Sequence, residues 1–420
     1  MVVTSSCATQ KWTEPAAKAA KSADIHRPPI RTPQLCLYGP NAWLGNLNVS
    51  MKGPFANLLS NLISQSASPC LSVYMATHPA SAQAAEDRIR LKNLLKDAEA
   101  RLGDSADWLD GPRQLLEDEE FWTHLSNSLL LFASPDGFEV VRTPLPFAED
   151  QALCSRYCLK QLIGYADHPE RIHLVAVSSK HVRLFECSTS DITEVPIPDT
   201  VQVASEFLGS DDREEEFQQH SVHARSGGTI FHGQGAGRDE EDEHRLRFFQ
   251  HVARGLERAL GANGSPVVLL GTQENLAQFR SAYKAPKDLI EVQGSGDHAN
   301  LHDLNRSAWD AVFARSQADR EKALAQFKEL EGSEAGIHDP VAIVQAASTG
   351  RVRALFVAPD AHVWGSADLE QHSFDVADEW SVNAVDLLDL AAVLTAKHGG
   401  AVHCVPRDQL GALAGALLFA

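Results

Sequence analysis

The sequence lacks the features that mark several classes of protein. Its seven cysteines are scattered and include no Cys-x-x-Cys pair, so neither a disulfide framework nor a zinc ribbon is expected, and a reducing cytoplasm fits best. The longest apolar runs, such as residues 387–395, fall far short of the roughly 20 residues that span a bilayer. Basic residues are also few, with 37 Lys plus Arg against 56 Asp plus Glu. The resulting net charge of −19 argues against contact with DNA, and any contact with RNA must be local.

The sequence does contain enough apolar material for several domains. Its 420 residues, of which 44% are hydrophobic, predict two to four domains of ordinary size. The first 34 residues carry five Lys or Arg against two acids, and they contain no apolar stretch of the kind found in signal peptides. We therefore expect residues 1–40 to be a basic, disordered arm.

The next part of the chain predicts an α+β domain over residues 41–198. A buried strand at residues 70–75 precedes an amphipathic helix whose inner face includes Leu91, Leu95 and Leu102. Strand-like segments follow at residues 128–133, 138–142, 173–178 and 182–187, and the last two are spaced as a hairpin. A charge run at residues 211–216 has no apolar face, which indicates an acidic linker over residues 199–218.

Residues 219–336 predict a middle α/β domain. A short strand at residues 228–231 and a glycine-rich loop lead into a helix with a buried stripe from Leu246 to Leu260. A central strand at residues 266–270 then begins an alternation of helices and strands, which ends in a long charged helix over about 302–330. The stretch 331–336 marks the next boundary.

Residues 337–420 predict a third domain, an αβα sandwich. Helices are expected at residues 340–347, 384–397 and 408–418, and strands at residues 354–358 and 401–405. This segment has four basic and ten acidic residues. It therefore suits a structural or protein-docking role better than RNA binding.

The loop His232-Gly-Gln-Gly-Ala-Gly237 is the main candidate for chemistry, because glycines let a backbone approach a ligand closely. A flexible connection would explain the same glycines. A phosphate-binding loop is a third interpretation, but the spacing differs from Gly-x-Gly-x-x-Gly, and five acids at residues 239–243 occupy the helix start where phosphate would bind. The loop alone leaves these interpretations open.

Several motifs together resemble the bacterial relatives of the archaeal and eukaryotic class-one release factors and Pelota. They are residues 69–74, residues 88–95, Phe121-Trp-Thr-His124, His232-Gly-Gln-Gly235 and residues 354–357. The resemblance covers about residues 65–420. It implies three domains of α/β and α+β class: a middle one with an RNase H-like α/β fold bearing a Gly-Gly-Gln loop, and a C-terminal αβα unit similar to the kink-turn-binding ribosomal proteins.

The resemblance also implies site residues and partners. Gly233 and Gln234 match the second glycine and the glutamine of the family loop, which enters the ribosomal peptidyl-transferase centre and promotes attack of water on the peptidyl-tRNA ester. His232 replaces the first glycine and restricts the backbone there. This replacement and the acids after the loop favour a ribosome-binding factor that does not hydrolyse. The implied partners are the ribosome, ribosomal RNA and a translational GTPase.

A cationic stripe follows the loop. His244, Arg247, His251, Arg254 and Arg258 recur three or four residues apart, which places them on one face of the predicted helix. A solvated face balanced by neighbouring acids would explain such a stripe, and so would an edge that contacts phosphates. Arg247, Arg254 and Arg258 are therefore the candidate RNA-binding residues.

No metal or cofactor is predicted. His298 and His302 share a helical spacing, as do the histidines within residues 220–223, but their polar surroundings favour solvated side chains. Cys154 and Cys158 are four residues apart without a histidine at ligand spacing, and buried cysteine is often a small apolar residue. No Gly-x-Ser-x-Gly motif is present, so no catalytic triad is assigned.

Three functions remain open from the sequence. The first is a ribosome-associated, release-factor-like protein of translation termination, ribosome rescue or hibernation, acting without hydrolysis. The second is a peptidyl-tRNA ester hydrolase that uses Gly233 and Gln234. The third is a hydrolase or nucleotide-binding enzyme unrelated to translation, because a fold does not determine a function.

Overall fold

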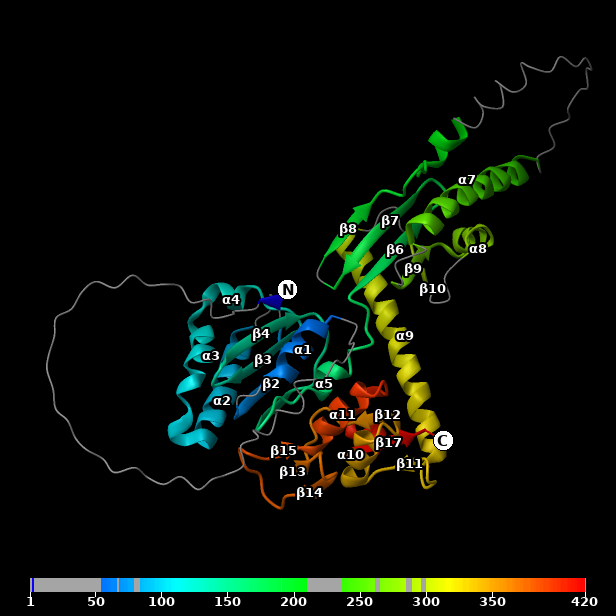
Figure 1. The fold of residues 1–420 in the computed structure, drawn as a ribbon. Helices are drawn as coiled ribbons and strands as arrows, with labels where there is room; N and C mark the ends of the chain where they lie inside the picture. The colour runs from blue at the N-terminus through cyan, green and yellow to red at the C-terminus, as the bar shows by residue number, and fades with distance from the viewer. Residues whose placement is uncertain are drawn as a thin grey trace, which may run out of the picture. The chain divides into compact units, whose positions relative to one another are not determined.

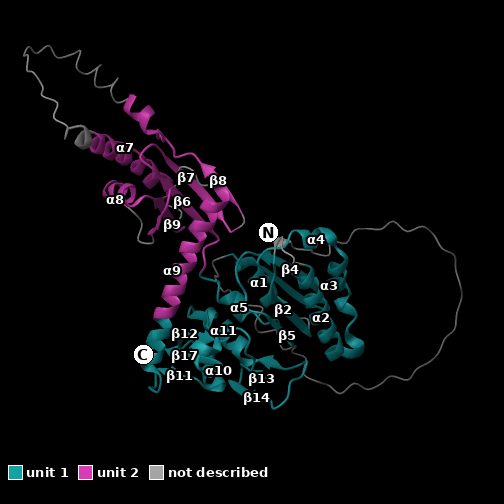
Figure 2. Cartoon of the chain, turned by 180° about the vertical axis from the view of Figure 1, so that it is seen from behind, with its two compact units in different colours: residues 1–167, 323–420 teal, residues 168–322 magenta. Residues whose placement is uncertain are grey.

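A computed structural model of the chain describes residues 2–3, 54–65, 68–78, 84–189, 191–209, 236–260, 265–284, 289–295 and 300–419 (Figure 1). The chain forms two compact units (Figure 2). Unit 1 comprises residues 1–167 and 323–420, and unit 2 comprises residues 168–322. Within the described ranges, no helix combines the length and the apolar content needed to cross a membrane.

The N-terminal part of unit 1 is an antiparallel sheet with the strand order β1-β4-β3-β2-β5. The strands are β1 (Val2–Val3), β2 (Cys70–Ala76), β3 (Ser128–Ser134), β4 (Gly137–Thr143) and β5 (Asp150–Cys154). Helices accompany the sheet: α1 (Ala56–Ser64), α2 (Ala84–Leu102), α3 (Asp110–Gln114), α4 (Glu119–Thr123) and α5 (Lys160–Ile163). Alternate residues of β2 and β3, such as Leu71 and Leu131, share a buried core with Leu91 and Leu95 of α2, as the helical spacing predicted.

The C-terminal part of unit 1 is a second sheet, ordered β11-β17-β12-β16. Its strands are β11 (Gly336–Ile337), β12 (Val352–Val357), β16 (Ala401–Cys404) and β17 (Ala414–Leu418). Three helices follow in this segment: α10 (Pro340–Ser348), α11 (Leu387–Lys397) and α12 (Arg407–Leu410). A small antiparallel sheet completes it, with β13 (Trp364–Asp368), β14 (Ser373–Val376) and β15 (Val385–Asp386). Phe356 and Leu417 pack against Phe327, near the end of the long helix α9 (Leu301–Leu330).

The prediction of a terminal helix over residues 408–418 is wrong. The chain forms only the short α12 and then β17, which pairs antiparallel with both β11 and β12. Gly411 adopts a left-handed φ of 71° at the end of α12, so the helix stops there. Gly415 lies against the Phe327 ring, where a Cβ would come within 2.4 Å of a ring atom. Pairing and burial in the sheet therefore override the helix propensity of an Ala- and Leu-rich segment.

Unit 2 is a three-layer α/β structure with the strand order β10-β9-β6-β7-β8. The strands are β6 (Arg171–Val177), β7 (Val182–Ser188), β8 (Ile192–Val195), β9 (Val267–Gly271) and β10 (Leu289–Gln293). One face of the sheet packs on α7 (Ala236–Leu260) and α8 (Gln273–Ala282), and the other face packs on the first part of α9. The mixed α/β class predicted from the sequence is confirmed.

The hairpin β6–β7 belongs to unit 2, although it precedes the domain boundary that we expected at residue 198. Its strand β6 pairs in parallel with β9, so it belongs to the sheet of unit 2 and not to the N-terminal α+β domain expected over residues 41–198. The side chains of β6 are buried on both faces from Ile172 onward, which is typical of an inner strand between two helix layers. Hairpin spacing predicted the pairing of β6 with β7 but carried no information about the partner on the far side of β6.

The arm expected over residues 1–40 contains a short strand at its start. Val2 and Val3 pair antiparallel with Val141 and Val140 as the edge strand β1. The remaining residues of the arm, 1 and 4–40, lie outside the described residues, as do residues 210–235, which include the expected strand at 228–231.

Candidate functional site

The residues predicted to carry chemistry fall into two groups. His232, Gly233 and Gln234 lie outside the described residues. Arg247, Arg254 and Arg258 lie on α7, which begins at residue 236 directly after that loop in the sequence. The structure therefore places the three arginines and leaves the Gly-Gln loop as a prediction.

The apolar face of α7 determines how this helix packs on the sheet of unit 2. Phe249, Ala253 and Leu256 of the predicted stripe are buried in the core of unit 2, together with Phe248 and Val252, which the stripe did not include. On the side of residues 197–200, Gly255 lets the helix approach closely, because a Cβ there would lie 2.0 Å from the Thr200 Oγ1 atom. Arg254 and Arg258 are exposed beside this contact, and Arg247, earlier on α7, is partly exposed.

The three arginines differ in their local partners. Arg247 forms an ion pair with Glu243, one turn earlier in α7, at 3.3 Å. Arg258 approaches Asp199 at 3.5 Å, and more than half of its side chain remains exposed. Arg254 is exposed, and its Nε donates to the backbone oxygen of Gln250 at 3.2 Å. Among the described residues, no acidic side chain forms an ion pair with Arg254.

Arg254 and Arg258 line a recess of about 580 Å³ on α7, together with His251 and Glu257. We call these four residues the α7 recess. The Glu257 carboxylate accepts a hydrogen bond from the backbone N–H of Lys284 at 3.2 Å, which holds it toward the end of α8. The recess thus has two guanidinium groups, one imidazole and one carboxylate that is already hydrogen-bonded.

His251 in the recess is held in its neutral form. Burial lowers its pKa, and the nearby charges of Arg254 and Arg258 lower it further. The Nε2 atom accepts a hydrogen bond from the backbone N–H of Val201 at 3.0 Å, which leaves Nδ1 as the protonated nitrogen. The ring also stacks on Phe207, with centroids 4.9 Å apart. The helical spacing pointed to His251, but Val201 lies 50 residues away and gives no signal in the sequence.

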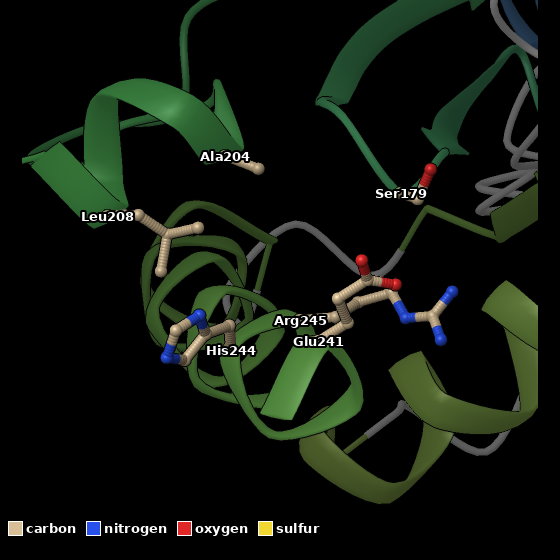
Figure 3. A pocket seen from close by; sticks show the side chains of 6 residues that line it. All are labelled: Ser179, Ala204, Leu208, Glu241, His244 and Arg245. Carbon is tan, nitrogen blue, oxygen red and sulfur yellow. The ribbon is translucent and has the colours of Figure 1, made fainter. Parts of the chain in front are cut away.

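A second pocket, of about 300 Å³, lies nearer the start of α7 and is shown in Figure 3. Glu241 and Arg245 extend toward the side where Ser179 lies, and His244 lies beside Leu208. The Arg245 Nη2 atom forms ion pairs with Asp242 and with Glu274, the latter at 3.0 Å. Because these carboxylates already neutralise its cation, this pocket suits an anion less well than the α7 recess does.

One group among the described residues has ligand atoms spaced for a metal ion: Cys158, His362 and Asp386, all in unit 1. The sequence did not bring these residues together, because more than 200 positions separate Cys158 from the other two. The ammonium of Lys160 lies 2.9 Å from the Asp386 Oδ2 atom, so a cation already occupies this group.

One family model matches part of the sequence. Residues 172–351 match the model of the bacterial archaeo-eukaryotic release factor family 3, which confirms the family resemblance predicted from the sequence. The matched segment contains α7 and its recess. No curated protein matches the sequence.

Solved structures with partial likeness come from archaea and yeast. The archaeal translation termination factor aRF1 is 16% identical over 87% of this chain and 97% of its own, with a TM-score of 0.23. Pelota of Archaeoglobus fulgidus is 14% identical over 69% of this chain and 78% of its own, with a TM-score of 0.30. Dom34 of S. cerevisiae, described as a translation termination-like factor that interacts with Hbs1, is 8% identical over 59% and 62%, with a TM-score of 0.32. TM-scores this low indicate only a partial likeness to these structures.

Proposed function

We propose that the protein is a ribosome-associated, release-factor-like translation factor whose α7 recess contacts RNA phosphates. The observation that carries this proposal is the pair Arg254 and Arg258 on the exposed face of α7, inside the segment that matches the release factor family. The partners we propose are the ribosome, its RNA and a translational GTPase, and the compartment is the cytoplasm.

The charge of the recess supports contact with phosphate. The chain as a whole carries −19, so long-range attraction to RNA is absent and binding must come from a confined cationic surface. Guanidinium groups donate two hydrogen bonds side by side to phosphate oxygens, and they position a protein on RNA without reading its sequence. The Nδ1–H of neutral His251 adds a donor without a further charge.

Co-sedimentation with ribosomes over a salt series tests the proposal. The test variant is Arg254→Glu combined with Arg258→Glu. The matched control is Arg171→Glu combined with Arg280→Glu, which changes the net charge equally at two exposed arginines of the same unit, 59% and 63% exposed. We expect the test variant to lose affinity about tenfold or more, with a salt dependence shallower by about one unit of slope for each lost phosphate contact.

The control distinguishes local contact from general charge. Substitutions of exposed side chains usually change stability by no more than about 0.5 kcal/mol, so a thermal melt confirms that each variant is folded. Equal loss of ribosome binding in both variants would show that net charge, and not the recess, governs binding. Wild-type binding by the folded test variant would reject the recess as an RNA contact.

We further propose that the protein acts in ribosome rescue or hibernation without hydrolysis. His232 at the first position of the loop and the acids at residues 239–243 support this role. The alternative, a peptidyl-tRNA ester hydrolase, rests on Gly233 and Gln234 and on their place directly before α7 in the sequence.

Release of labelled peptide from ribosome complexes separates the two roles. Gly233→Ala restricts the loop backbone and displaces any oxyanion-stabilising contact it makes, and loss of one such contact typically lowers kcat by about a hundredfold or more, so hydrolysis would fall to that extent if the loop is catalytic. We expect the wild-type protein to bind ribosomes and to release no peptide. Release by wild type that Gly233→Ala abolishes would establish the hydrolase instead.

The finer fold assignments belong to the same proposal. We assign an RNase H-like fold to the middle α/β domain, and an αβα fold similar to the kink-turn-binding ribosomal proteins to the C-terminal domain. The helix layers on both faces of the unit 2 sheet support the first assignment. The sheet of β12 and β17, with α10 and α11 in the same segment and Phe327 of α9 packed against it, supports the second.

A further inference from the structure

A group of ionised side chains is buried inside unit 1, where residues 150–160 meet residues 361–389. It consists of Lys160, Asp150, His362 and Asp386, which we call the buried ion cluster. The Lys160 Nζ atom donates to the Asp386 Oδ2 atom at 2.9 Å and to the backbone oxygen of Ala361 at 2.5 Å. The side chains of Lys160 and Asp386 are each 1% exposed. A lysine is almost never buried to this extent unless it is paired.

His362 extends the cluster to a second carboxylate. Its Nδ1 lies 2.8 Å from the Asp386 Oδ2 atom, and its Nε2 lies 2.8 Å from the Asp150 Oδ1 atom. A carboxylate beside each nitrogen favours the imidazolium, which donates at both positions. Burial alone would lower the pKa of His362, but the hydrogen bonds to Asp150 and Asp386 raise it to about 11. The cluster therefore balances two cations against two anions.

The position of Lys160 argues against a metal ion among Cys158, His362 and Asp386. Its ammonium lies 2.9 Å from the Asp386 Oδ2 atom and 3.2 Å from the His362 Nδ1 atom, which are two of the three potential ligand atoms. A histidine ligand must be neutral with a free lone pair, whereas His362 is held as the imidazolium. The hydrogen bond with Cys154 and burial raise the pKa of the Cys158 thiol, so the thiolate that a metal requires is disfavoured.

The same two segments are also joined through the backbone. The Asp389 Oδ1 atom accepts hydrogen bonds from the backbone N–H groups of Leu159 and of Lys160, the latter at 2.7 Å. The Ser155 Oγ atom donates to the backbone oxygen of Ala384 at 2.9 Å. Each of these contacts links residues more than 200 positions apart. The buried ions thus lie inside a hydrogen-bonded junction between the N-terminal and C-terminal parts of unit 1.

We propose that the buried ion cluster makes the N-terminal part (residues 1–167) and the C-terminal part (residues 323–420) of unit 1 open and unfold as one cooperative body. Opening the junction exposes two balanced ion pairs, and removing one partner leaves an uncompensated buried charge. Neither part therefore loosens without the other. Lys160 supplies, from within the chain, the cation that a metal ion would otherwise provide.

Hydrogen exchange of the wild-type protein gives the first test. We expect the slowest amides of β2 in the N-terminal part and of α11 in the C-terminal part to exchange with equal protection, as members of one opening unit. Protection that differs by tenfold or more between these two elements would show that they open separately. This measurement needs no variant, so it decides the matter even if a substitution prevents folding.

Lys160→Met gives the second test, with Lys397→Met as its matched control. Lys397 is exposed in the last turn of α11, so the same substitution there removes a charge without touching the cluster. We expect exchange in β2 and in α11 to rise together by at least tenfold in Lys160→Met and to stay at the wild-type rate in Lys397→Met. An increase in exchange confined to the residues that contact Lys160 would show that the cluster stabilises only its immediate surroundings.

A double-mutant cycle with Asp386→Asn tests the pairing itself. We expect each single variant to lower the melting temperature of unit 1 by on the order of 10 °C. The double variant should lose clearly less than the sum of the two, because it no longer holds an unpaired buried charge. Additive losses would contradict the pairing.

Metal analysis of the purified protein after incubation with zinc tests whether Cys158, His362 and Asp386 bind a metal ion. We expect no stoichiometric zinc. One equivalent of bound zinc that is lost in Cys158→Ser would overturn the assignment of Lys160 as the cation of this group.

Discussion

Two histidines in the two units show how neighbours set the protonation state of one side chain. His362 in unit 1 lies between the carboxylates of Asp150 and Asp386, and its pKa rises to about 11. His251 in unit 2 lies beside Arg254 and Arg258, and burial together with these two charges lowers its pKa. At neutral pH, one ring is therefore a cation and the other is neutral.

The same contrast separates cations that are available to a ligand from those that are not. The ammonium of Lys160 and the imidazolium of His362 are fully engaged with carboxylates inside the protein. Arg254 is exposed and bonds only to the backbone of its own helix among the described residues. A cation is therefore more available to an anionic ligand when it is exposed and not paired with a carboxylate, which charge counts do not reveal.

The largest expected effect is the pH dependence of stability from His362. Its folded pKa of about 11 exceeds the ordinary value of 6.5, so the folded state keeps a proton that the unfolded state releases. This contribution is complete below pH 6.5 and is lost as pH rises toward 11, by up to about 1.4 kcal/mol per pH unit. Denaturant unfolding of unit 1 should show this slope between pH 7 and about 7.5, below the ionisation of unfolded thiols. His362→Gln should flatten it, and His398→Gln at an exposed site should not.

The second prediction concerns Asp389, which is buried beside the cluster. Burial raises its pKa, as does the charge of Asp386, and Lys160 and Arg156 lower it, with a net value of about 6. The folded state therefore binds a proton more tightly than the unfolded state, and stability falls as pH rises from about 4 to 6. Asp389→Asn should remove this loss, because the amide oxygen still accepts the two backbone hydrogen bonds. We expect a gain of roughly 2 to 3 kcal/mol at pH 7.5, and destabilisation there would contradict the sign.

A third prediction compares two arginines on one face of α7. Arg254 has no acidic partner among the described residues, whereas Arg247 is paired with Glu243. Arg254→Ala should therefore weaken binding to ribosomes by about tenfold and lower the salt slope by about one. Arg247→Ala should change both less, since part of its charge is already neutralised. Equal effects in co-sedimentation would show that a local ion pair does not control how available an arginine is to RNA phosphates.

Much of the fold could be predicted from periodicity, because the pattern reports which face of an element is buried. The buried stripe of α7 and the strands β2, β3, β9 and β12 follow from local sequence. The strand β17 could not be predicted, since its Ala and Leu residues favour a helix until β11 and β12 supply partners. The pairing of β6 with β9 likewise depends on residues far apart in the sequence, so local periodicity does not predict it.

The candidate sites divide in the same way. The arginines of α7 were visible from spacing alone, because a helix converts steps of three and four into one face. The buried ion cluster was not, because it joins side chains from residues 150–160 with those from residues 362–386. The neutral state of His251 depends on the backbone N–H of Val201, which no helical pattern contains.

The smallest expected effect is the pH dependence contributed by His251. Its folded pKa is lowered, so the folded state binds a proton less tightly than the unfolded state does. Its contribution to stability is present above pH 6.5 and is lost as pH falls below that value, the opposite direction to His362. The effect is small because the ring is only partly buried and solvent screens the two arginines. His251→Gln, whose amide oxygen is able to accept the Val201 N–H, should make the unfolding of unit 2 less sensitive to pH between 6.5 and 5. A steeper acid loss in this variant than in wild type would mean that the arginines do not govern the protonation of the recess.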